Sequence, residues 1–123
     1  MSSNRTILIA EPLDILSSEL LGFATDNGIE IKRTSSLKGT LLTIQEHSID
    51  VLILDAELLE EDCDFISIIK GMGENLPIIV CAETNTPEFE SRIRKKGIFF
   101  YHLKSFGIQD LELAIGNALA KSS

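Results

Sequence analysis

The sequence predicts an α/β fold in which one parallel β-sheet is covered by helices on both faces. Short apolar runs alternate along the chain with longer segments whose apolar residues recur at helical spacing. The runs at Val51–Leu54 and Ile78–Ala82 are continuously apolar, which is typical of parallel strands that are buried on both faces. Short connections join these segments, and this alternation favours parallel strands with helical crossovers.

The first two strand and helix pairs occupy the N-terminal third of the chain. Ile7–Ala10 is a short apolar run, and the residues that follow at helical spacing are Leu13, Leu16, Leu20, Phe23 and Ala24. Pro12 lies near the expected start of this helix and Gly28 lies just past its end, where both residue types are favoured. Ile29 and Ile31 alternate with charged residues, which predicts a half-buried edge strand. The next helix is marked by Leu37, Leu41 and Ile44.

The third and fourth pairs follow the same order of strand and helix. Val51–Leu54 is the expected central strand, and Asp64 is the expected N-cap of the next helix. That helix carries Phe65, Ile68, Ile69 and Met72. Pro77 opens the strand Ile78–Ala82. The tripeptide Thr86–Glu88 then predicts a capped helix start, because proline is favoured at the first helical position.

The fifth pair completes the predicted sheet. Phe99–Leu103 is the last expected strand, and the final helix is marked by Ile108, Leu111, Ile115, Ala118 and Leu119. A chain of 123 residues is the size of one ordinary domain. Because no linker, repeat or low-complexity segment interrupts the pattern, residues 1–123 are expected to form a single domain.

The charge of the chain argues against several kinds of partner. There are 11 Lys and Arg residues against 19 Asp and Glu residues, which gives a formal net charge of -8. This charge repels phosphate backbones and anionic lipids, so we expect neither direct nucleic-acid binding nor membrane binding. Cys63 and Cys81 form no CxxC pair and are interpreted as reduced thiols. The sequence shows neither a signal peptide nor a membrane-spanning run, so a soluble cytoplasmic protein is expected.

An acid and a cation are expected at the same edge of the sheet. Asp55 follows the central strand directly, and Lys104 follows the strand Phe99–Leu103 in the same way. Open α/β folds build their sites at the carboxyl ends of their parallel strands. The two side chains are therefore predicted to converge, which suggests phosphoryl chemistry on the aspartate.

An ordered set of segments also carries a family resemblance: Ile7–Pro12, Asp50–Asp55, Pro77–Val80, Gly97 and Tyr101–Lys104. Over nearly its whole length, the chain resembles the receiver domain of bacterial two-component response regulators. The resemblance implies the flavodoxin-like (βα)5 fold, with a doubly wound parallel sheet in the strand order 2-1-3-4-5. It also implies a signalling module rather than an enzyme, in which an aspartate accepts a phosphoryl group from a phosphohistidine.

The resemblance assigns a role to each residue that matches the family's site. Asp55 corresponds to the phosphoacceptor, and Lys104 corresponds to the lysine that pairs with the phosphoryl oxygens. Glu11 corresponds to the second of two acids that hold Mg²⁺, with Asp55 and the backbone carbonyl of Glu57 as further ligands. Tyr101 corresponds to the aromatic switch that reports phosphorylation to the surface. A divalent metal and a lysine would neutralise the charge that develops on the transferring phosphoryl group.

The chain departs from the family pattern at the same site. Ala10 stands where the family has its first acid, and Ala82 stands where it has Thr or Ser. Without that hydroxyl the aromatic switch has no trigger. Glu83 follows at a position that is usually small, and its carboxylate would repel a phosphoryl group, while Thr84 offers a substitute hydroxyl. Ser105 replaces a proline that is usually joined by a cis bond, so the loop is expected to be strained or differently shaped.

Several of these residues also have purely structural interpretations. An acid such as Glu11 before a helix N-terminus is favoured by the helix dipole alone. Lys104 would form a structural ion pair with Asp55 if the site has lost its chemistry. Tyr101 is expected to serve core packing more than switching, because Ala82 removes the hydroxyl.

Three classes of function follow from these observations. The first is a receiver domain that is phosphorylated weakly at Asp55 by a histidine kinase or phosphotransfer protein, and that acts on a downstream protein or a fused output domain. The second is a phosphorylation-independent module for protein interaction or homodimerisation. The third, a flavodoxin-like enzyme or cofactor binder, is disfavoured because Glu11–Leu13 offers no glycine-rich phosphate loop after the first strand.

Overall fold

The protein is a five-stranded parallel sheet with helices on both faces, in a computed structural model that describes residues 5–60, 62–72, 75–84 and 86–122. The strands are β1 (Arg5–Ala10), β2 (Ile29–Thr34), β3 (Val51–Asp55), β4 (Ile78–Ala82) and β5 (Phe100–Leu103). The α-helices are α1 (Leu16–Asp26), α2 (Leu37–Glu46), α3 (Ala56–Leu59), α4 (Asp64–Lys70), α5 (Pro87–Lys95) and α6 (Ile108–Ser122). A short 3-10 helix, η1 (Lys104–Phe106), follows β5.

The sheet has the strand order β2-β1-β3-β4-β5, and every pair is parallel. This confirms the flavodoxin-like order 2-1-3-4-5 that the family resemblance implied. The outer strand β2 has only half-buried and exposed residues and none that is fully buried, as expected for an edge strand. In contrast, every residue of β3 and β4 is buried, because helices cover both faces of these central strands.

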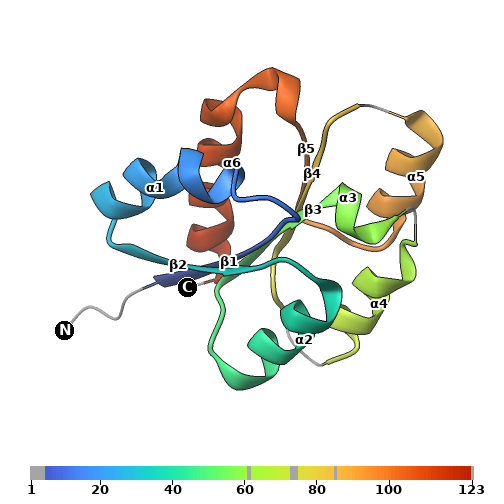
Figure 1. Ribbon diagram of the computed structural model, residues 1–123. Coiled ribbons are helices and arrows are strands. Elements are labelled where there is room, and N and C mark those ends of the chain that lie inside the picture. The colour runs from blue at the N-terminus through green and yellow to red at the C-terminus, as the bar shows by residue number, and fades with distance from the viewer. Residues whose placement is uncertain (1–4, 61, 73–74, 85, 123) are drawn as a thin grey trace.

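Two hydrophobic cores lie on the two faces of the sheet. Helices α1 and α6 cover one face, whose core includes Ile7, Ile53 and Ile115. Helices α2, α4 and α5 cover the other face (Figure 1), and its core includes Leu8 and Leu54. Neighbouring residues of one strand therefore enter different cores, since successive side chains of a β-strand point to opposite faces. This packing explains why the central strands are apolar at every position.

The first helix starts later than the sequence pattern predicted. Helix α1 begins at Leu16, and Leu13 is 67% exposed in the preceding loop. The expected start near Pro12 is therefore wrong. The reason is that the Glu11 carboxylate accepts hydrogen bonds from the backbone amides of residues 15–17, so the chain between Glu11 and the helix has to loop outward.

Two further differences follow the central strand. The short helix α3 was not predicted, and the Asp55 side chain caps it by accepting a hydrogen bond from the amide of Glu57. Asp64 is the first residue of α4 and not its N-cap, because the carboxylate of Asp62 accepts the hydrogen bond from the Asp64 amide.

Proline does occupy the first turn of α5, as expected, but the Thr86 side chain makes no capping hydrogen bond. Within the described ranges, no helix is long and apolar enough to cross a bilayer.

Candidate functional site

Asp55 and Lys104 meet at the carboxyl edge of the sheet. Asp55 is the last residue of β3, and Lys104 begins the turn after β5. The Lys104 Nζ donates to Asp55 Oδ2 at 2.8 Å, while the Glu57 amide donates to the other carboxylate oxygen, Oδ1, at 2.9 Å. The Asp55 side chain is 6% exposed and the Lys104 side chain is 23% exposed. The structure therefore brings the predicted acid and cation into direct contact.

Lys104 keeps its charge through its carboxylate neighbours. Burial lowers the pKa of its ammonium, but the hydrogen bond and the charge of Asp55, together with the charge of Glu83, outweigh burial and raise the pKa above its usual value of 10.5. The Glu83 carboxylate lies 3.6 Å from the lysine nitrogen, and its side chain is 80% exposed. Glu83 thus points toward the cation and remains largely in solvent, so its contact is weaker than that of Asp55.

Glu11, the candidate metal ligand, is used as a helix cap. Its Oε1 accepts hydrogen bonds from the amides of Ile15 and Leu16 at 3.2 and 2.8 Å. Its Oε2 accepts from both the amide and the hydroxyl of Ser17, each at 2.9 Å. Burial alone would raise the pKa of this carboxyl, but these hydrogen bonds together lower it below the usual 4.5. Glu11 is therefore an ionised group in the cap of α1, at its positive dipole end.

Arg33 is a site residue that the sequence patterns did not single out. It lies on β2 beside the first strand, in register with Ile9. Its Nε is 3.6 Å from the Glu11 carboxylate, and one terminal nitrogen donates to the Glu11 carbonyl at 3.2 Å. A weaker contact of 3.9 Å reaches the carboxylate of Asp14. The sequence did offer one signal for Arg33: it lies near the carboxyl end of the edge strand. Because the strand order places β2 next to β1, a side chain at that position lies close to Glu11.

Tyr101 is packed in the core beneath α5. Its side chain is 5% exposed, and its hydroxyl has no hydrogen-bond partner within the described part of the chain. The Arg94 guanidinium lies 5.6 Å from the centre of the tyrosine ring and forms a 2.7 Å ion pair with Glu90. Burial, followed by the charge of Glu90, raises the pKa of the phenol, and Arg94 opposes this rise. The ring occupies an inward position, with Ala82 buried at the end of β4.

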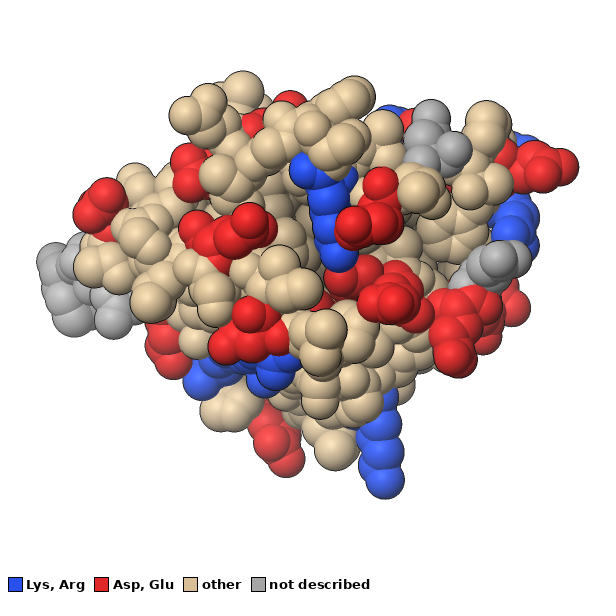
Figure 2. Space-filling view, turned by 45° about the horizontal axis from the view of Figure 1, so that its top comes forward, with Lys and Arg blue, Asp and Glu red and all other residues tan. Residues whose placement is uncertain are grey.

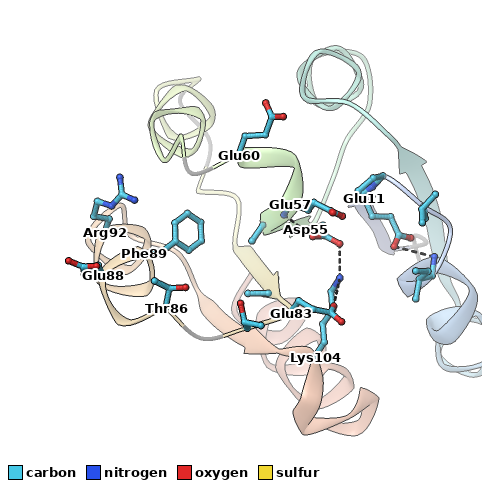
Figure 3. A pocket seen from close by; sticks show the side chains of 16 residues that line it. Glu11, Asp55, Glu57, Glu60, Glu83, Thr86, Glu88, Phe89, Arg92 and Lys104 are labelled. Carbon is cyan, nitrogen blue, oxygen red and sulfur yellow. Dashed lines mark hydrogen bonds and ion pairs between the residues drawn. The ribbon is translucent and has the colours of Figure 1, made fainter.

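A cavity of about 590 Å³ opens above the Asp55–Lys104 pair. Its acidic lining residues are Glu11, Asp55, Glu57, Glu60, Glu83 and Glu88. Figure 3 shows these side chains around the opening, and acidic residues are also plentiful on the face in Figure 2. Thr84, which was considered as a substitute hydroxyl, also lines the cavity and is exposed. Lys104 and Arg92 are the basic residues in this lining, so the cavity presents an acidic surface to an incoming ligand.

The loop after Lys104 has its own shape. Residues Lys104–Phe106 form the 3-10 helix η1, and Gly107 follows with a φ of 92°, which a glycine adopts without strain. The described residues contain no cis peptide bond. The expectation that Ser105 leaves this loop strained or differently shaped from the family's loop stays a prediction.

The side chains at the site do not fit a preformed Mg²⁺ site of the kind that the resemblance implied. Ala10 provides no side-chain oxygen, and the described residues include no cluster of three or more Asp, Glu, His or Cys with metal-binding geometry. Both oxygens of Asp55 already accept hydrogen bonds, and so do both oxygens of Glu11. Mg²⁺ prefers oxygen ligands in near-octahedral geometry, so binding would require these contacts to change.

Comparisons with known proteins agree with this geometry. Residues 7–116 match the family described as the response regulator receiver domain. The chain is 27% identical over 117 residues to the DNA-binding transcriptional regulator NtrC of Bradyrhizobium sp. (strain RP501 Parasponia). This alignment covers 94% of the chain but 24% of the regulator, so the chain spans about a quarter of that relative.

Solved receiver structures share the fold. The signal receiver domain of an HD domain-containing protein from Pseudomonas fluorescens Pf-5 matches with a TM-score of 0.86 and 17% identity, over 98% of each chain. The receiver domain of the Francisella response regulator 1452 matches with a TM-score of 0.84 and 21% identity, over 98% of this chain and 100% of that one. The family match extends over most of the sequence. The chain therefore belongs to the response regulator receiver domain family, a family of two-component signalling modules.

Proposed function

We propose that this domain accepts a phosphoryl group on the Asp55 carboxylate, and that it does so weakly. The observation that carries the proposal is the 2.8 Å contact between Lys104 Nζ and Asp55 Oδ2 at the base of the cavity. A carboxylate oxygen would attack phosphorus while the bond from phosphorus to the donor breaks, and the departing group would keep the bonding electrons. Lys104 would then neutralise the negative charge on the phosphoryl oxygens.

The donor in this proposal is a phosphohistidine on a histidine kinase or a phosphotransfer protein, because the chain belongs to the receiver family. In the reaction, the bond between phosphorus and the imidazole nitrogen would break as the bond to Asp55 forms. The output is a downstream protein or a fused output domain, and the setting is the cytoplasm. Family members generally bind Mg²⁺, and we propose weak binding here, since Ala10 removes one acid and Glu11 is engaged by α1.

Two features support weak rather than efficient phosphorylation. Glu83 lines the cavity next to Lys104 and adds a negative charge where a phosphoryl group would enter. Ala82 lacks the hydroxyl that the family uses to bind a phosphoryl oxygen. A hydrogen bond to a charged group contributes about 2 kcal/mol, so losing it would reduce the stability of the phosphorylated form.

A mass measurement tests phosphorylation directly. The chain is incubated with Mg²⁺ and acetyl phosphate or a phosphoramidate, and the intact mass is followed with time. We expect a slow gain of one phosphoryl group that Asp55→Asn abolishes. Asp26→Asn serves as the matched control, because Asp26 is an exposed aspartate at the end of α1. A gain that persists in Asp55→Asn would remove Asp55 from the proposal.

The arrangement of Tyr101 favours a second candidate function, a phosphorylation-independent module for protein interaction or homodimerisation. The ring is buried under Arg94, and Ala82 lacks the hydroxyl that would couple it to Asp55. In this alternative, partner contacts do not change when Asp55 is modified. Sedimentation across a range of protein concentrations, with and without beryllofluoride, separates the two: an association that is equal in both conditions supports the second function.

A further inference from the structure

Each of the two buried carboxylates at the carboxyl edge has its own protein cation. Lys104 pairs with Asp55 at 2.8 Å, and Arg33 lies 3.6 Å from the Glu11 carboxylate. The Glu11 side chain is 1% exposed, whereas the Arg33 side chain is 30% exposed. A buried carboxylate needs a compensating charge or several hydrogen bonds, and Glu11 has both.

Arg33 contacts Glu11 at two different points. Its Nε faces the carboxylate, while a terminal nitrogen donates to the backbone carbonyl of the same residue at 3.2 Å. The planar guanidinium therefore connects β2 to the main chain and the side chain of Glu11 at once, through two different nitrogens in a fixed geometry. In Figure 3 the dashed line from Glu11 runs to the α1 side and is separate from the line between Asp55 and Lys104.

We infer that Arg33 is a positioning residue that holds Glu11 in the cap of α1 and keeps this acid from serving a metal at Asp55. The guanidinium supplies the positive charge that a divalent cation would otherwise supply to Glu11, and it repels a cation that approaches the same carboxylate. This inference rests on the proposed function, because it concerns the same site. Two features then explain why the site fits Mg²⁺ poorly: Ala10 provides no acid, and Arg33 holds the remaining acid, Glu11, away from the metal.

The inference concerns Mg²⁺ affinity, which can be measured without any phosphoryl donor. Mg²⁺ is titrated into the native chain, Arg33→Gln and Lys32→Gln, and the amide signals of Glu11, Ala56 and Glu57 are followed by NMR. Lys32→Gln is the matched control: it removes the same charge from the neighbouring position on β2, where Lys32 pairs with Glu30 at 3.2 Å. Both variants therefore change the overall charge equally.

We expect Arg33→Gln to bind Mg²⁺ about fivefold more tightly than Lys32→Gln, the effect of removing one ion pair near the surface. Arg33→Lys keeps the charge but not the planar group that reaches Glu11 through two nitrogens, and it should fall between the native chain and Arg33→Gln. Equal affinities for Arg33→Gln and Lys32→Gln, or no binding to either, would overturn the inference. If Arg33 merely supported the fold, Arg33→Gln would lower the unfolding temperature without changing the Mg²⁺ affinity.

Separate measurements test the role of Arg33 and the phosphorylation of Asp55, so one can fail while the other holds. Phosphorylation of Asp55 is read from the intact mass, whereas the role of Arg33 is read from the Mg²⁺ titration. If Arg33→Gln unfolds, Arg33→Lys and Lys32→Gln still permit the comparison, and equal affinities for these two variants and the native chain contradict the inference. A chain that gains the phosphoryl mass while Arg33 has no effect on Mg²⁺ retains its proposed function and loses this inference.

Discussion

The Asp55 half and the Glu11 half of the carboxyl edge use similar residues in different ways. Both halves have a buried carboxylate at the end of a central strand and a cation nearby. Both carboxylates line the cavity, and Asp55 accepts from one backbone amide and one lysine. Glu11 accepts from three amides and one hydroxyl, and it also lies beside an arginine. Position at a strand end therefore does not make a carboxylate available, since the number of donors around it decides this.

This difference separates structural from chemical importance within one site. Removing the charge at Glu11 should damage the fold, because four hydrogen bonds and an ion pair depend on it. Removing the charge at Asp55 should affect phosphoryl acceptance more than the fold, because Lys104 can reach water through the cavity.

The largest effect is expected when Glu11→Gln is compared with Asp55→Asn. Glu11→Gln should lower the free energy of unfolding by about 2 kcal/mol, because an amide provides one acceptor oxygen where two charged oxygens were used. Asp55→Asn keeps an acceptor for the Glu57 amide and should cost less than about 1 kcal/mol. Urea unfolding of both variants at neutral pH measures the difference. Equal losses would show that the two halves are held in the same way.

The second prediction concerns acid. Because the folded protein lowers the pKa of Glu11 from 4.5, the stabilisation by this carboxylate is complete above about pH 4.5 and is lost as the pH falls through the lowered value. The difference in unfolding free energy between the native chain and Glu11→Gln should therefore shrink below pH 4.5. Urea unfolding between neutral pH and about pH 3 measures this difference. A difference that stayed constant would mean that other contacts of residue 11 dominate.

The third prediction links the Asp55 half to Tyr101. In the native chain, beryllofluoride should leave the Tyr101 environment unchanged, because Ala82 has no hydroxyl to transmit the modification. Ala82→Thr restores a hydroxyl and should make the two sites respond together, with a coupling of about 1 kcal/mol. The chain has one Tyr and no Trp, so tyrosine fluorescence reports on Tyr101 alone.

Ala82→Val is the control for that experiment, because valine has nearly the shape of threonine without the hydroxyl. If Ala82→Val couples the sites as strongly as Ala82→Thr, then side-chain size and not hydrogen bonding is responsible. A large fluorescence response in the native chain would contradict the expected loss of the relay.

The smallest effect is expected at the surface above Tyr101. Arg94→Ala removes the contact with the tyrosine ring and the ion pair with Glu90, and it should cost less than about 1 kcal/mol. It should nevertheless change the fluorescence of Tyr101, since the guanidinium lies over the ring. Arg92→Ala is the control, because Arg92 lies 5.9 Å from the ring of Phe89 instead. No change in fluorescence would show that Arg94 does not cover the ring in solution.

Strand positions and the convergence of Asp55 with Lys104 were predictable from the sequence. Strands that are buried on both faces have to be apolar throughout, so β3 and β4 stand out from the rest of the chain. Their ends are then determined to within a residue, and a parallel sheet brings those ends to one edge. The start of α1 was not predictable in this way, because a carboxylate outside the helix decides where its backbone amides find acceptors.

By itself, the sequence determined the parallel sheet, its two covered faces, and an acid and a lysine at one edge, because periodicity and strand ends are local properties of the chain. The tertiary structure alone decided how many hydrogen-bond donors surround each carboxylate. Arg33 reaches Glu11 because β2 lies beside β1, and the loop after Glu11 folds back so that three amides meet its oxygens. The sequence gives no regular spacing from which these contacts could be predicted. The hydrogen bonds and charges around each acid then determine its role.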